Sequence, residues 1–139
     1  MYGGSVANNP GWKEERRLSF ADMLSEITSR VEGSVAAIIL GIDGIPIERW
    51  TSEEDHGLDI EMIATEFTTL LRRAMHTAAD TGLGELQEMM LGTGQAQFLV
   101  RPITSEYFLM LALAPSGNIG RARFELRKAQ LALEHEFSL

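Results

Sequence analysis

Residues 34–50 read SVAAIILGIDGIPIERW. The first part, 35–40, is a continuous apolar run, and the last part, 45–50, alternates between apolar and polar residues. Between them lies the pair Asp43-Gly44, which is typical of a tight turn between two strands. The stretch therefore predicts a β-hairpin. Its first strand is apolar on both faces and belongs in the centre of a sheet, whereas Pro46 lacks the N–H that a central strand donates and places the second strand at an edge.

A short amphipathic helix is predicted directly before this hairpin. Ser19 and Asp22 form an S-x-x-D capping pattern at its start, and Gly33 ends it. Its apolar residues recur at helical spacing: Phe20, Met23, Leu24, Ile27 and Val31. Residues 1–17 mix Gly, Asn, Pro and charged residues without apolar periodicity, which predicts a disordered N-terminal tail. We therefore expect a single folded domain over residues 18–139.

A long helix is predicted over residues 58–81, after an acidic loop at 51–57 whose carboxylates favour the positive end of the helix dipole. Gly82 and Gly84 end this helix. Its predicted inner stripe, which Leu71 and Met75 widen, consists of Ile60, Ile63, Phe67, Leu70, Ala74 and Ala78. The opposite side is predicted to carry Thr65, Thr68, Thr69, Arg72, Arg73 and His76.

Three strands joined by short hairpin turns follow, at residues 85–92, 95–103 and 106–114, and a final helix begins after the turn at 115–118. The last strand is apolar throughout and must be buried on both faces. Two such strands need helices on both sides of the sheet. The element order αββαβββα thus predicts an α/β fold, a three-layer α/β/α sandwich around a five-stranded, mostly antiparallel sheet. The strand at 85–92 mixes polar with apolar residues and is predicted to form the other edge, where exposed apolar residues invite pairing with another chain.

The composition narrows the classes of function. The chain has 139 residues, no cysteine and a formal net charge of −8. Disulfides and thiol chemistry are excluded, and we expect a cytoplasmic protein. The negative charge opposes binding to a nucleic-acid backbone, and the apolar runs are too short to cross a membrane. A basic and then apolar signal pattern is not found at the N-terminus.

Motifs for chemistry are missing from the sequence. It has no G-x-x-x-x-G-K-[ST] loop for phosphate binding and no G-x-S-x-G nucleophile turn. His56, His76 and His135 fall in three separate elements, which predicts no metal site. The carboxylates at 53–55 are adjacent on a loop and are expected to be solvated rather than to act as an acid/base pair. We therefore expect no enzymatic activity and no cofactor.

Two basic groups stay open to more than one interpretation. Arg72 and Arg73 are either a solvated face or an interface hot spot. A second cluster consists of Arg121, Arg123, Arg127 and Lys128. Cations at the start of a helix oppose its dipole, so these side chains either pair with acidic neighbours such as Glu125 or contact an acidic partner.

Two segments carry a resemblance to a known family: VAAIILGIDGIPI at residues 35–47 and GRARFELRKA at residues 120–129. Together with the element order, they resemble the Roadblock (dynein light chain) family over about residues 18–137, and the last helix resembles that of bacterial members that bind Ras-like small GTPases. The resemblance implies a dimer formed by pairing edge strands, with its interface at Phe67, Leu86, Glu88 and Met90. It also implies a GTPase-docking face on the middle helix, at Thr65, Thr68, Thr69, Arg72, Arg73 and His76.

The resemblance predicts a homodimeric regulator that activates or scaffolds a Ras-like small GTPase. Members of this kind accelerate GTP hydrolysis by repositioning the GTPase, without an arginine finger. The gliding-polarity regulator of this family has small residues on that face, whereas this chain has Arg72-Arg73. The departure leaves two outcomes open: a different partner GTPase, or none. Two alternatives stay open: an adaptor that ignores the bound nucleotide, and a PAS-like small-molecule sensor.

Overall fold

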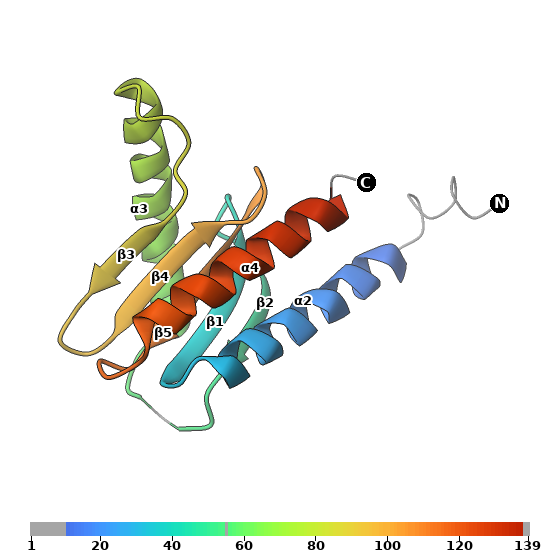
Figure 1. The fold of residues 1–139 in the computed structure, drawn as a ribbon, viewed down its shortest axis with the longest axis vertical. Coiled ribbons are helices and arrows are strands. Elements are labelled where there is room, and N and C mark those ends of the chain that lie inside the picture. Colours follow the sequence, from blue (N-terminus) through green and yellow to red (C-terminus); the bar gives the residue numbers. More distant parts are fainter. Residues whose placement is uncertain (1–10, 55, 138–139) are drawn as a thin grey trace.

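The computed structural model describes residues 11–54 and 56–137 as one three-layer domain (Figure 1). The helices and strands follow the predicted order αββαβββα, and the predicted fold class is confirmed. The elements are α2 (Gly11–Arg30), β1 (Ser34–Gly41), β2 (Pro46–Thr51), α3 (Ile60–Asp80), β3 (Met89–Gly92), β4 (Gln97–Pro102), β5 (Tyr107–Leu113) and α4 (Ile119–Phe137).

The five strands form one sheet in the order β2-β1-β5-β4-β3, and every neighbouring pair is antiparallel. The two apolar strands, β1 and β5, lie next to each other at the centre and are buried on both faces, as predicted. The β2 strand is an edge strand, and its Pro46 faces Leu40 at a register shift in the ladder. A missing N–H is tolerated there because, among the described residues, no strand lies on the outer side of β2.

Alternate residues of the central strands enter two separate cores, since successive side chains of a strand point to opposite faces. Ala37 and Ile39 of β1 pack with α2 and α4, whereas Ile38 and Leu40 pack with α3. Figure 1 shows the consequence for the layers: α2 and α4 lie side by side over one face of the sheet, and α3 covers the other.

Two turns fix where the paired helices sit. Gly33, between α2 and β1, has a φ of +89°, and a Cβ atom there would lie 2.7 Å from the Cα of Gly117 in the turn before α4. The same turns are joined by a hydrogen bond from the Ala114 N–H to the Gly33 carbonyl, 2.8 Å long. A side chain at position 33 would therefore push apart the two turns that bring α2 and α4 together.

The predicted start of the first helix at Ser19 is wrong, because α2 begins at Gly11. Residues 11–17 of the predicted tail are therefore helical, and residues 1–10 of it lie outside the described residues. The segment lacks apolar periodicity, but its run of Lys, Glu and Arg has high intrinsic helix propensity, and no Gly or Pro interrupts it after Gly11. A helix that packs from Phe20 onward is thus continued in the N-terminal direction.

The predicted edge strand at 85–92 is shorter than expected, because only Met89–Gly92 pairs with β4. Gly82 and Gly84 both have positive φ and turn the chain after α3. Glu88 then directs its carboxylate to Arg123 of α4, which holds the segment before β3 away from the β4 ladder. Over Arg101 and Pro102, β4 consequently pairs with β5 alone.

Candidate partner-binding surface on helix α3

Helix α3 is held on the sheet by a small set of apolar side chains. Asp59 caps its start, accepting a hydrogen bond from the Met62 N–H at 3.1 Å. Phe67 and Leu71 are buried in the core beneath it, and the Phe67 ring lies 4.9 Å from that of Phe98 on β4, centroid to centroid. The outward side of α3 is therefore the side that a partner can reach.

The prediction of which side chains of α3 face the core is wrong for Thr68 and Leu70. Thr68 was predicted to face outward but is only 2% exposed, and its hydroxyl donates to the Ala64 carbonyl at 2.8 Å. Leu70 was predicted to face the core but is 48% exposed. The reason is the β1–β2 turn: a Cβ at Gly44 would lie 3.6 Å from Thr68 Cγ2, so Thr68 faces this turn and is covered by it. Thr68 is therefore not part of the docking face.

The other five predicted docking residues share the exposed side of α3: Thr65, Thr69, Arg72, Arg73 and His76. Arg72 is anchored, because its Nε–H donates to the carbonyl of Ile42 in the β1–β2 turn at 2.7 Å. Arg73 has no ion pair or hydrogen bond within the part of the chain that the structure describes. One arginine is thus held in a fixed position, and the other is free to meet a partner.

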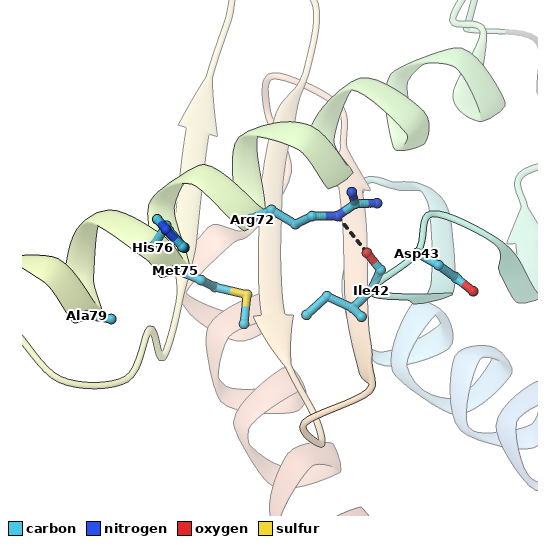
Figure 2. Close-up of a pocket in the computed structure, with 6 residues that line it drawn as sticks. All are labelled: Ile42, Asp43, Arg72, Met75, His76 and Ala79. Atoms are coloured by element: carbon cyan, nitrogen blue, oxygen red, sulfur yellow. Dashed lines mark hydrogen bonds between the residues drawn. The ribbon is translucent and has the colours of Figure 1, made fainter.

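A shallow hollow lies between this side of α3 and the β1–β2 turn. It is lined by Ile42, Asp43, Arg72, Met75, His76 and Ala79. Figure 2 shows Arg72 reaching across to the Ile42 carbonyl, with the side chains of Met75 and Ile42 pointing toward one another. The Asp43 carboxylate accepts the Ile45 N–H at 3.0 Å and so shapes the turn. An apolar floor with a cationic rim can receive a side chain of a protein partner, but it brings together no nucleophile and base.

The four predicted dimer-interface residues lie in different surroundings. Phe67 is a core residue of the single chain, so its prediction as an interface residue is wrong. Leu86 packs partly against the core beneath α3. Met90 on β3 is 52% exposed, and its neighbour Leu91, which is not among the predicted interface residues, is exposed as well. The apolar edge of the sheet is therefore formed by Met90 and Leu91.

Glu88 is engaged within the chain. Its carboxylate accepts two hydrogen bonds from Arg123, at 2.6 and 3.0 Å, and lies 3.9 Å from Arg101. The hydrogen bond from Arg123 holds the pKa of the Glu88 carboxyl below its usual value, against the opposing effect of burial. It also raises the pKa of Arg123. Glu88 thus anchors the start of β3 to α4, a role that its spacing in the sequence does not indicate.

No group of three or more His, Asp or Glu side chains able to hold a metal ion is found within residues 11–54 and 56–137. The only ion pair of a histidine among those residues joins His56 to Glu54 at 3.9 Å. None of the described helices is long and apolar enough to cross a membrane.

Solved structures show where this fold has been seen before. The chain is similar to MglC from Myxococcus xanthus, with 29% identity and a TM-score of 0.63, over 85% of this chain and 98% of that one. It is also similar to the Roadblock/LC7 domain from Streptomyces avermitilis, with 13% identity and a TM-score of 0.73, over 86% and 98% of the two chains. For the gliding protein MglB from Thermus thermophilus the identity is 16% and the TM-score 0.75, over 88% and 89%. No protein-family model and no curated protein sequence matches the chain.

Proposed function

Since the chain has the Roadblock/LC7 fold and resembles bacterial MglC and MglB, we propose that it is a homodimeric regulator of a Ras-like small GTPase. The GTPase docks on the outward side of α3, at Thr65, Thr69, Arg72, Arg73 and His76. The observation that carries the proposal is the pair of neighbouring arginines on this side. One is anchored to the β1–β2 turn, and the other is exposed and unpaired in the described part of the chain.

Dimer formation is supported by the edge of the sheet at β3. The outer side of this strand has no neighbouring strand within the described chain, and Met90 and Leu91 are exposed along it. Antiparallel pairing of two β3 strands would satisfy the free main-chain groups and cover these apolar side chains. The two-fold axis would also place the two α3 helices on the same face of a continuous sheet. The docking surface would then be formed by both protomers.

A regulatory role fits the chemistry of the α3 side. Arginine is enriched at interface hot spots because its planar guanidinium makes several hydrogen bonds and also stacks on apolar groups. The anchored Arg72 has lost much of its side-chain freedom before binding, which lowers the entropy that association costs. Regulation by repositioning a GTPase, as the family resemblance implies, requires such a preorganised surface and no catalytic group on the regulator.

The test of docking uses the purified protein and the Ras-like GTPase encoded nearest to its gene. We expect co-elution with the GTP-loaded form and a changed rate of GTP hydrolysis. Arg73→Glu is expected to weaken binding by about tenfold or more, because it places a negative charge in the centre of the surface. Arg127→Glu on α4, on the other face of the sheet, makes the same charge change and is the matched control.

The results separate the proposal from its alternatives. Equal binding to the GDP-loaded and GTP-loaded GTPase, with unchanged hydrolysis, would indicate the adaptor that ignores the nucleotide. Binding that Arg73→Glu does not weaken would remove the α3 side as the docking surface.

The dimer is tested separately by light scattering: Leu91→Lys is expected to yield monomers. Ile45→Lys, at a more exposed apolar position in the β1–β2 turn, is expected to leave the mass unchanged.

A further inference from the structure

The outward side of α4 carries two large apolar side chains that the fold does not use. Phe124 and Leu131 are each 58% exposed. They are seven residues apart, which is close to two helical turns, so they lie on the same side of the helix. That side is opposite to the one that Ala122, Leu126 and Leu133 bury against the sheet. Phe124 and Leu131 therefore form an exposed apolar ridge along α4, which we call the α4 ridge. One flank of the ridge borders the hollow between α4 and residues 84–88.

Cations line both flanks of the α4 ridge. At 100° per residue, Arg123 and Arg127 lie on one flank, and Arg121 and Lys128 lie on the other. These are 4 of the 12 Lys and Arg residues of a chain whose net charge is −8. The helix dipole disfavours cations near a helix start, so local helix stability does not explain their number. The basic cluster that the sequence left open is thus arranged as two rows around an apolar centre.

Acidic residues within the chain balance only part of this positive charge. Glu125 is the only acidic residue between positions 121 and 128, and it points inward, with 2% of its surface exposed. Its carboxylate lies near three cations: Arg121 at 2.9 Å, Arg30 of α2 at 3.5 Å and Lys128 at 3.9 Å. Arg30 also pairs with Glu26 of its own helix at 2.6 Å, so Glu125 is left to balance Arg121 and Lys128.

The remaining two cations of the ridge differ in how they are paired. Arg123 is paired with Glu88, whereas Arg127 has no ion pair within the part of the chain that the structure describes. The guanidinium of Arg121 also lies 5.5 Å from the centre of the Phe124 ring and so borders the apolar ridge with positive charge. Glu134, which is exposed on the same flank as Arg127, reduces the positive charge beside Leu131. The four cations still outnumber Glu88, Glu125 and Glu134, so the ridge keeps a small surplus of positive charge.

The positive strip is only one helix wide. On α2, which lies beside α4, the exposed residues opposite the buried side include Asp22 and Glu26. A flat anionic surface that reached the α4 ridge would also meet these carboxylates and be repelled by them. A single helix that lies along α4 would avoid them. The shape of the charge distribution therefore selects a narrow ligand.

We propose that the α4 ridge binds an acidic amphipathic helix of a partner protein. Apolar residues of that helix, spaced three or four apart, cover Phe124 and Leu131, and carboxylates on its two flanks meet the cations on either side of the ridge. This surface lies on the face of the sheet opposite to α3. It is therefore independent of the proposed GTPase-docking surface and allows a second partner to bind the same protomer.

Fluorescence anisotropy with two labelled peptides of about 18 residues tests the proposal. Both contain Leu, Glu and Ala in the same amounts; in one the leucines form a single stripe with glutamates on both flanks, and in the other their order is scrambled. The full chain is expected to bind the striped peptide about tenfold or more tightly than the scrambled one. Phe124→Ser with Leu131→Ser, or Arg127→Glu alone, is expected to abolish this preference.

Matched controls are present elsewhere in the chain. Ile45→Ser removes an equally exposed apolar side chain, and Arg73→Glu makes the same charge change on α3; both are expected to bind the striped peptide like the unaltered protein. The Phe124/Leu131 variant is expected to keep its melting temperature and its effect on the GTPase. Equal binding of both peptides, no binding of either, or unaltered binding by the ridge variants would overturn the proposal. Tighter binding to phosphatidylglycerol vesicles or to single-stranded DNA than to the striped peptide would assign the ridge to a different ligand and overturn it as well.

Discussion

The two faces of the sheet are covered in different ways. On one face, α2 and α4 lie side by side and are joined by the ion pair of Arg30 with the buried Glu125. On the other face, α3 is the one helix within the described residues, and Figure 1 shows its C-terminal end extending past the sheet. Both layers leave apolar side chains exposed on their outer surfaces: Phe124 and Leu131 on α4, and Leu70 on α3. At the β3 edge, Leu91 is exposed on the sheet face beneath α3 and Met90 on the face beneath α4.

The dimensions of the elements explain this difference. Five strands span roughly 20 Å across the sheet, because neighbouring strands are about 4.8 Å apart. A helix with its side chains is about 10 Å wide, so two helices cover such a face and one covers about half of it. The α2–α4 layer is therefore complete, and the proposed binding site at the α4 ridge lies on its outer surface. The α3 layer has room for a second helix, which the α3 of a second protomer would supply in the proposed dimer.

The largest expected effect concerns the single helix. Phe67→Ala removes the main side chain that packs α3 on the sheet, and we expect it to lower the free energy of unfolding by about 3–4 kcal/mol. Urea denaturation followed by circular dichroism measures this loss. Because Phe67 is buried within one chain, the loss is expected to be the same at low and high protein concentration.

Leu70→Ala is the matched control on the same helix. Leu70 is largely exposed, and its truncation is expected to cost less than about 1 kcal/mol in the monomer. A loss at Leu70 as large as that at Phe67 under monomeric conditions would contradict the phase of α3 described above. The difference between the two layers would then need another explanation.

The next effect concerns the ion pairs that join α2 to α4. Glu125→Ala removes the buried carboxylate that Arg30, Arg121 and Lys128 share, and it leaves a small cavity. We expect a loss of about 2 kcal/mol in the free energy of unfolding. The loss is moderate because all three cations can be hydrated once the carboxylate is gone.

Arg30→Ala is the comparison variant for this cluster. It removes one of the three cations and leaves Glu125 with Arg121, so a smaller loss is expected in the same urea titration. If Glu125→Ala proved neutral, the ion cluster would contribute nothing to the two-helix layer. Packing of the apolar stripes alone would then hold α2 and α4 together.

Most of the fold could be predicted from residues 34–50 and from the apolar last strand. A strand that is apolar on both faces is stable only in the centre of a sheet that helices cover on both sides. A strand that contains a proline such as Pro46 is placed at an edge, because proline has no N–H to donate to a second neighbouring strand. The start of β3 could not be predicted, because it depends on the contact between Glu88 and Arg123, which are 35 residues apart. The propensity of a short segment to form a strand does not depend on such a distant contact and so cannot predict where the strand begins.

The candidate site could be predicted less completely than the fold. The outward position of Arg72, Arg73 and His76 follows from helical periodicity. For Thr68 and Leu70 the prediction is the reverse of the structure, in which Thr68 is buried and Leu70 is exposed. Periodicity assigns the more apolar residue to the core, and this rule fails where a turn approaches a helix closely or where an apolar residue is left on the surface. The hydrogen bond from Arg72 to the Ile42 carbonyl could not be predicted, because it joins residues that are 30 positions apart in the sequence.

The smallest expected effect concerns the link between the β3 edge and the two-helix layer. The pKa of Glu88 is held below its usual value of 4.5 by Arg123, so the charged carboxylate is favoured in the folded state. A lowered pKa stabilises the fold fully above the pKa of the unfolded chain, and this contribution is lost as the pH falls through the folded value. Glu88→Gln should therefore lower the melting temperature slightly at neutral pH. The gap should narrow as the pH falls below 4.5 and close once the pH is below the lowered pKa of Glu88. The control is Glu85→Gln, at an exposed neighbouring residue that has no ion pair in the described chain. If the difference in melting temperature between Glu88→Gln and the unaltered protein stayed constant down to acid pH, the charge of Glu88 would not anchor β3 to α4.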